Sequence, residues 1–210
     1  MAAITPDQRP LVGSTVRLDA FVPSDAPGLF AALDEPRVWA AGYGGGPVAR
    51  PADADSFGRL MRSRLASGQR PYTVRLMADS PLGAAGTVVG TSTLHDVDLA
   101  NERIHLGWTA YSPAVWGSEV NPECKLLLLR HAFEDCGFER VKIQTDLMNV
   151  RSQQAIERLG AVREGVLRHH MLRADGTRRD TVVYSILRSE WPATLERLTS
   201  RLAAGAPSQP

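Results

Sequence analysis

Apolar and polar residues alternate along several short stretches of the chain, and this period of two predicts β-strands. The strands expected on this basis cover residues 11–21, 72–77, 87–94, 104–109, 141–145, 165–173 and 181–187. The Asp175-Gly176 pair between the last two strands is typical of a tight hairpin turn. Ser112-Pro113 ends the strand at 104–109, because proline has no N–H to donate to a neighbouring strand.

Other stretches place apolar residues three or four positions apart, which predicts amphipathic helices. The expected helices cover residues 26–33, 53–66, 122–136, 149–159 and 193–202. The third has the sharpest start, with Asn121 as its N-cap and Pro122 at its first position. Gly137 is the expected end of this helix. Residues 37–51, between the first two helices, are expected to form a glycine-rich loop.

The order of these elements predicts an α+β fold around one mostly antiparallel sheet, because strands and helices alternate irregularly along the chain. One strand is followed by two helices, three consecutive strands, a helix, a strand, a helix and a hairpin. We expect a single domain over residues 11–202, with an N-terminal extension at 1–10 and a flexible tail at 203–210.

Composition narrows the possible functions. The formal net charge of +1 argues against nucleic acid as the main partner. No apolar run approaches membrane-spanning length, and the first ten residues lack the pattern of a signal peptide. Cys124 and Cys136 would lie roughly 18 Å apart on one helix, which is too far for a disulfide. Reduced cysteines favour a cytoplasmic protein, and no Cys/His spacing predicts a metal site.

The strand, loop and helix start within residues 103–137 form a unit that could bind an anion. A helix N-terminus leaves backbone N–H groups without partners and carries partial positive charge, which suits a phosphate. The alternative is an ordinary strand-to-helix connection, which is the more common case. The glycine-rich loop at 37–51 lacks both a Walker lysine and the GxGxxG spacing, so a mobile lid or substrate loop is the favoured interpretation.

The segments WGSEVNPECKLLLL and DLMNVRSQQAIERLGAVREGVL, in this order of elements, resemble the GNAT superfamily of N-acetyltransferases. The RimJ/RimL-like branch is the most similar, and the resemblance covers residues 15–190. It implies a GNAT-like mixed, mostly antiparallel sheet with helices on both faces and a splayed central strand. It also implies acetyl-CoA (coenzyme A) as co-substrate.

The resemblance further implies which residues contact acetyl-CoA. Trp108, Thr109 and Ala110 fall on the splayed strand, beside the thioester. The segment 116–121 falls on the pyrophosphate loop, and the segment 149–152 follows the fifth strand. The implied contacts there are Trp116, Gly117, Ser118, Val120, Asn121, Asn149, Arg151 and Ser152. The pyrophosphate loop departs from the family's pattern at Trp116, Glu119 and Asn121. Glu119 stands where the family has glycine, so either its carboxylate points away from the pyrophosphate or the cofactor binds weakly.

Acetyl transfer to an amine needs a base for the amine and an acid for the leaving thiolate. His170 is the first candidate for the base, since histidine titrates near neutral pH. His105 is the second, because it stands where the family often has glutamate, and Glu164 is the third. Many members carry a tyrosine acid at the position of Ile156, so Ser152 becomes the candidate for relaying a proton. Cys124 is interpreted as a packing residue.

The sequence therefore predicts a cytoplasmic N-acetyltransferase that moves the acetyl group of acetyl-CoA directly to a primary amine. The acceptor is a protein N-terminal α-amine or a small-molecule amine. Two alternatives stay open: a GNAT-fold protein that binds acyl-CoA with little catalytic activity, and an acyltransferase for longer acyl chains. Neither nucleic acid nor a membrane is an expected partner, and a homodimer through sheet-edge pairing stays open.

Overall fold

The computed structural model describes residues 2–40 and 42–205, and these contain one eight-stranded sheet in the order β1-β2-β3-β4-β5-β6-β8-β7. Neighbouring strands are antiparallel except for β5 and β6, which are parallel. This confirms the predicted α+β fold. The strands are β1 (Leu11–Val12), β2 (Val16–Ala20), β3 (Arg70–Leu76), β4 (Val88–Asp98), β5 (Arg103–Tyr111), β6 (Arg140–Asp146), β7 (Val162–Leu172) and β8 (Arg178–Leu187).

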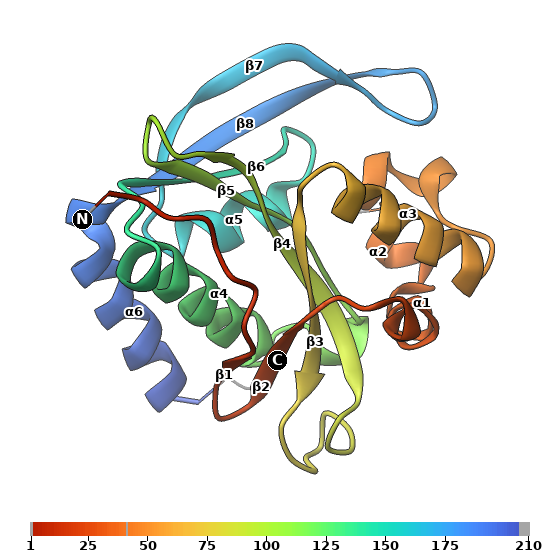
Figure 1. Cartoon of the computed structure of the whole chain (residues 1–210). Coiled ribbons are helices and arrows are strands. Elements are labelled where there is room, and N and C mark those ends of the chain that lie inside the picture. Colours follow the sequence, from red (N-terminus) through yellow and green to blue (C-terminus); the bar gives the residue numbers. More distant parts are fainter. Residues whose placement is uncertain (1, 41, 206–210) are drawn as a thin grey trace.

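Helices lie on both faces of the sheet. They are α1 (Ala26–Leu33), α2 (Pro36–Ala40), α3 (Ala54–Ala66), α4 (Val120–Arg130), α5 (Val150–Glu157) and α6 (Trp191–Ala203). Figure 1 shows α4 and α6 together on one side of the sheet and α1, α2 and α3 on the other. Each side has its own apolar core, the larger beneath α4 and the smaller around Trp39, Phe57 and Met61.

Three local predictions were wrong. Residues 11–21 form the β1–β2 hairpin rather than one strand, because the chain turns back at Gly13 and Ser14. The expected loop at 37–51 contains α2, which is held in place by the buried Trp39 indole donating to the Leu33 carbonyl. Helix α4 begins at the fully buried Val120 with Glu119 as N-cap, so Asn121 lies within the first turn.

The central strand β5 is splayed, as predicted. It pairs with β6 over only three residues, from Arg103↔Arg140 to His105↔Lys142, and the two strands then separate. On its other edge β5 carries a bulge, because both Trp108 and Thr109 lie opposite Ser92 of β4. Trp108 has a φ of 49°, in the left-handed region that few residues with a side chain adopt. The bulge bends β5 beside the gap.

The first turn of α4 is tied to the β1–β2 hairpin by the carboxylate of Glu123, which is 4% exposed. This carboxylate accepts hydrogen bonds from the backbone N–H groups of Ser14, Thr15 and Val16 at 2.7–2.8 Å, and from the Ser14 hydroxyl at 2.7 Å. A side chain at Gly13 would collide with the carboxylate, since a Cβ there would lie 2.4 Å from Cδ of Glu123. The turn sequence and the helix start therefore fit one another.

The ends of the chain and the cysteines complete the fold. The N-terminal extension is attached to the domain through Ile4, whose N–H donates to the carbonyl of Cys136 at 2.8 Å. Most of the predicted tail, residues 206–210, lies outside the described residues. Cys124 and Cys136 are both buried and free. No helix within residues 2–40 and 42–205 is long and apolar enough to cross a membrane.

Replacing Glu123 with alanine should destabilise the fold strongly. Three backbone N–H groups, including that of the buried Val16, would lose an ionised acceptor, and each such loss costs about 1–3 kcal/mol where the donor is buried. We expect the free energy of unfolding of Glu123→Ala to fall by about 3 kcal/mol or more in urea denaturation. Glu196→Ala, at an exposed position on α6, is the matched control and should stay within about 0.5 kcal/mol of the unchanged protein. A similar small loss for both variants would contradict the anchoring role.

Candidate active site

A cavity of about 350 Å³ lies where β5 and β6 separate. Residues 106–111 of β5 form one wall and residues 143–146 of β6 form another. Residues 42–44 contribute from the side of the sheet that carries α2, while α4 and α5 contribute from the other direction. The cavity therefore joins the two sides of the sheet through the gap between its central strands.

The cavity gathers nearly all the residues that the resemblance assigned to acetyl-CoA. Those lining it are Trp108, Thr109, Ala110, Trp116, Gly117, Ser118, Asn121, Asn149, Arg151 and Ser152. Val120 does not line it, since its side chain is fully buried in the core behind. Among the described residues, Glu119 is also absent from the lining, as expected if its carboxylate points away.

The loop before α4 is held in a definite shape. The Trp116 indole N–H donates to the carbonyl of Tyr111 at 2.9 Å, and the Ser118 hydroxyl donates to that of Val115 at 2.7 Å. Gly117 has a φ of 84°, which a residue with a side chain would adopt only under strain. The loop therefore delivers the N-terminus of α4, with its partial positive charge, to the cavity.

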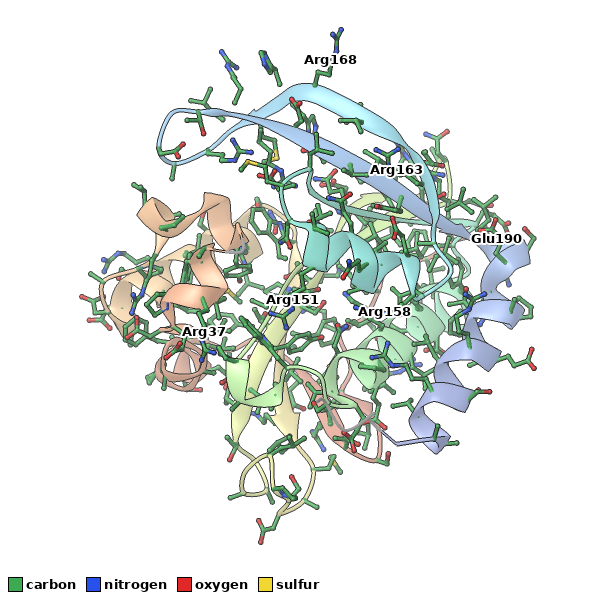
Figure 2. All side chains as sticks on the ribbon, turned by 180° about the vertical axis from the view of Figure 1, so that it is seen from behind. Arg37, Arg151, Arg158, Arg163, Arg168 and Glu190 are labelled. Carbon is green, nitrogen blue, oxygen red and sulfur yellow. The ribbon has the colours of Figure 1, made fainter. Side chains whose placement is uncertain are left out.

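Arginines make this end of the cavity cationic. Arg151, Arg158 and Arg201 line it, and burial together with the nearby Arg158 lowers the pKa of both Arg151 and Arg201. None of the three forms an ion pair with a carboxylate of the described chain. The Arg151 guanidinium lies 3.6 Å from the centre of the Trp116 ring, and Arg37 approaches the same ring at 5.7 Å (Figure 2). Unpaired cations at a helix N-terminus suit a ligand with several phosphates.

Two histidines lie side by side beneath the cavity wall. His105 is 2% exposed, and its Nδ1 is 3.2 Å from Oδ2 of Asp96. His95, on β4, places its Nδ1 3.1 Å from Oδ1 of the same carboxylate, with the two ring centres 4.0 Å apart. Burial lowers the pKa of His105 to about 4 and also lowers that of His95. The hydrogen bond from His105 holds the pKa of the Asp96 carboxyl well below its usual value.

The free nitrogens of these histidines are directed at Gly107, which lines the cavity. A Cβ at Gly107 would lie 2.8 Å from Nε2 of His95 and 3.1 Å from Nε2 of His105. Neither Nε2 atom has a hydrogen-bond partner in the described part of the chain. The two imidazole nitrogens are therefore buried directly behind Gly107, and the backbone of this glycine separates them from the cavity.

Sequence reasoning named His105 but missed His95 and Asp96. The three side chains place possible metal-ligating atoms within 4.8 Å of one another, although the sequence predicted no metal site. Cross-strand pairing of His95 with His105 creates the cluster, and spacing along one strand cannot reveal such pairs. The alternation of apolar and polar residues in both strands was the available signal for this pairing.

The other predicted catalytic residues are placed differently. Ser152 lines the cavity near the apolar Ile156. His170 is exposed on β7, with its Nδ1 3.1 Å from the Thr181 hydroxyl oxygen, and it is not among the described residues that line the cavity. Glu164 is held by Arg140 and by the Ser185 hydroxyl, also outside the lining.

Two neighbouring residues of α4 have very different surroundings. Burial raises the pKa of the Cys124 thiol to about 12, which supports its interpretation as a packing residue. Lys125, which sequence reasoning missed, lines the cavity although it is only 6% exposed. Its ammonium donates to the Thr109 hydroxyl oxygen at 2.8 Å, and burial lowers its pKa to about 8. The signal for Lys125 in the sequence was a lysine within the apolar run CKLLLL of a predicted helix.

Comparison with known families gives one match that covers most of the chain. Residues 15–162 match the family model described as an acetyltransferase (GNAT) domain.

Individual relatives agree with this match. The chain is 27% identical over 141 residues to the "Putative ribosomal N-acetyltransferase YdaF" of Bacillus subtilis, covering 67% of this chain and 74% of that protein. It is 36% identical to the crystal structure of a putative acetyltransferase from T. thermophilus, with a TM-score of 0.79 and coverage of 92% and 97%. Mycobacterium smegmatis RimJ, solved with CoA-disulfide, shares the fold at 19% identity, with a TM-score of 0.72 and 91% of each chain covered.

The lowered pKa of His105 should make the stability of the fold depend on pH. In the unfolded chain an imidazole binds a proton below about pH 6.5, whereas folded His105 stays neutral down to about pH 4. Stability is therefore full above pH 6.5 and falls as the pH drops toward 4, by a total of about 3 kcal/mol. Urea denaturation between pH 7 and pH 4.5 should show this loss, and His105→Asn should remove much of it. An unchanged pH dependence in His105→Asn would contradict the assignment.

Proposed function

The chain belongs to the acetyltransferase (GNAT) domain family, whose members use acetyl-CoA, and on this premise we propose that it transfers the acetyl group directly to a primary amine. The acceptor in this proposal is a protein N-terminal α-amine or a small-molecule amine. The observation that carries it is the cavity at the β5–β6 gap, which is lined both by the arginines around Trp116 and by Tyr43 and Trp108 from the other side of the sheet. Two substrates can therefore meet in it from opposite sides of the sheet.

The cationic end fits coenzyme A. The N-terminus of α4 with Gly117 and Ser118 would hold the pyrophosphate, while Arg151, Arg158 and Arg201 would offset the phosphate charges. Beyond His105, the edge of β5 that faces the gap is not paired with β6, so its backbone is available to an extended ligand. When bound, acetyl-CoA supplies an acetyl group activated as a thioester.

The aromatic end is the proposed acceptor side. Tyr43, Gly44 and Trp108 line it, and Arg64 holds the two aromatic rings together. The Arg64 guanidinium lies 4.2 Å from the centre of the Trp108 ring and donates to the Tyr43 hydroxyl at 3.0 Å. The name of the B. subtilis relative, a putative ribosomal N-acetyltransferase, supports a protein amine over a small-molecule amine as the acceptor.

For the general base we propose the pair His95 and His105. Their buried Nε2 atoms lie against Gly107 in the cavity wall, and burial keeps both rings in the neutral form that accepts a proton, while it also weakens them as bases. The Asp96 carboxylate lies at the Nδ1 atoms, and it favours a positive charge on the imidazoles when a proton arrives. His170 stays a candidate from the sequence, and Ser152 stays a candidate for relaying a proton.

We place this reaction in the cytoplasm. The two buried, free thiols of Cys124 and Cys136 support a reducing compartment.

Thiol release tests the function. Purified protein with acetyl-CoA would be offered peptides with free N-terminal amines, the same peptides with blocked amines, and small primary amines. The proposal expects release of CoA thiol only with a free amine, together with a matching mass increase of the acceptor. Binding of acetyl-CoA without amine-dependent thiol release would instead favour a GNAT-fold protein that only binds acyl-CoA. Faster turnover with longer acyl-CoAs would favour the third alternative.

Arg151 should contribute directly to coenzyme A affinity. Replacing it with alanine removes an unpaired cation from the cavity, and loss of one charge-assisted contact costs about 1.4 kcal/mol, or tenfold in Kd. Calorimetric titration of Arg151→Ala with acetyl-CoA should show that increase. Arg168→Ala is the matched control, because Arg168 projects from β7 away from the cavity in Figure 2. Equal affinities in the two variants would place the phosphates elsewhere.

The candidates for the base can be compared directly. The variant His95→Asn/His105→Asn should lower kcat about a hundredfold or more, as expected when a base is lost, with little change in the Kd for acetyl-CoA. His170→Asn should retain near-normal kcat. The reverse pattern would return the role of the base to His170.

A further inference from the structure

Lys125 is an unusual residue for its position in the fold. Of the 24 basic residues in the chain, only Lys125 and Lys142 are lysines, and the rest are arginines. Lys125 lies in α4, within the run CKLLLL, and its side chain is buried at the cavity. Burying a cation disfavours folding unless a partner compensates it, and an apolar side chain of similar volume often gives a more stable protein. A buried lysine therefore calls for a reason beyond packing.

The contacts of Lys125 leave its charge uncompensated. Its Nζ donates to the Thr109 hydroxyl oxygen at 2.8 Å, and that hydroxyl lies 2.7 Å from the hydroxyl of Ser92. No carboxylate of the described chain forms an ion pair with it, and its neighbour Glu123 is already bound by the β1–β2 hairpin. An ammonium has three N–H bonds, and Thr109 is the acceptor of one. The others are available to a ligand in the cavity.

If the thioester lies beside Thr109, as the resemblance implies, the position of Lys125 relates it to the reacting end of the ligand rather than to the phosphates. It bonds to Thr109, at the bulge of β5, whereas Arg151 packs on Trp116, before the start of α4. The cavity lining also includes the neutral side chains of Ser152 and Ile156 from α5, and on the α3 side the Arg64 guanidinium lies 4.2 Å from the centre of the Trp108 ring. Lys125 therefore brings a positive charge from α4 to the bulge of β5.

We propose that Lys125 is the general acid of the reaction, donating a proton from Nζ to the sulfur of coenzyme A as the thioester bond breaks. This inference rests on the proposed function, because it assigns a residue to one step of amine acetylation. It differs from the proton relay through Ser152, which would need a separate donor.

Atoms and electrons balance in this step. The neutral amine nitrogen of the acceptor forms a bond to the acetyl carbon, and the bond from that carbon to sulfur breaks. The electron pair of the broken bond goes to sulfur, which takes a proton from Lys125 Nζ and leaves as the thiol. The acceptor nitrogen releases its surplus proton to the base. Lys125, left as a neutral amine, regains a proton from solvent after the thiol departs.

The acidity of Lys125 suits this donation. Burial lowers its pKa to about 8, and an ordinary thiol has a pKa of about 8.5, so the proton passes between groups of nearly equal basicity. Proton transfer in catalysis is most effective when the donor pKa lies near the working pH. Arginine, which supplies the other 22 basic residues, keeps its proton at any such pH and could stabilise a thiolate without protonating it.

Kinetic measurements on two variants separate proton donation from charge. Lys125→Met removes both and should lower kcat with acetyl-CoA about a hundredfold, while the Kd for acetyl-CoA changes less than about threefold. Lys125→Arg keeps the charge and should recover only part of the loss. An acetyl thioester of an acidic aromatic thiol needs no proton on departure, so Lys125→Met should lose much less activity with that donor. Arg130→Met, an exposed cation on α4, is the matched control and should behave as the unchanged protein.

A spectroscopic readout tests the contact without turnover. An ammonium next to the sulfur should lower the pKa of the bound CoA thiol by about one to two units, which the ultraviolet absorbance of the thiolate reports across pH. The lowering should be present with the unchanged protein and with Lys125→Arg, and absent with Lys125→Met. Thermal unfolding would show that Lys125→Met is folded, since a buried cation is replaced by an apolar side chain.

The outcomes distinguish this inference from the function on which it rests. Amine-dependent thiol release by the unchanged protein, together with near-normal kcat in Lys125→Met, would overturn the role of Lys125 and leave the acetyltransferase function intact. An equal loss with both thioester donors, or a thiol pKa that is the same in all variants, would also overturn it. No amine-dependent thiol release by the unchanged protein would overturn the function and this step together.

Discussion

The separation of β5 from β6 after three paired residues is the constraint on which the rest of the site depends. A sheet normally satisfies the backbone groups of its central strands by pairing them with one another. Here the bulge at Trp108 and Thr109 bends β5, and the gap becomes a cavity lined by both strands. The buried lysine and the arginines line this gap from α4, α5 and α6, and the histidine pair lies behind Gly107 in its wall.

The direction of α4 matters as much as the gap itself. Its N-terminus serves the cavity only because the first turn is fixed, and the four hydrogen bonds to Glu123 fix it against the β1–β2 hairpin. The Glu123 carboxylate is fully satisfied by these donors, whereas Lys125, two residues later, is not paired with any carboxylate that the structure describes. Helix α4 thus carries two charged groups with different roles. The Glu123 carboxylate stabilises the fold, and the Lys125 ammonium can bind a ligand.

The sequence predicted the sheet and most helices because burial on one face leaves a clear period in the chain. Helix α1 was predicted with its observed bounds, and the hairpin of β7 and β8 followed from Asp175-Gly176. The β1–β2 hairpin was missed because its turn depends on Glu123, more than a hundred residues away. The resemblance supplied the cavity residues, but not His95 or Lys125. Their significance comes from cross-strand pairing and from burial, which no local pattern records.

The short contact between β5 and β6 also divides the sheet into two parts, each continuous in sequence. Strands β1 to β5 come from residues 11–111, and β6, β7 and β8 from residues 140–187, so each part can assemble from local connections. Three residue pairs of parallel sheet, with the helices packed across them, hold the two parts together. A ligand extended along the gap would contact both parts and link them for as long as it stays bound. Its binding energy would then add to the rigidity of the junction, and its departure would let the two parts move against each other.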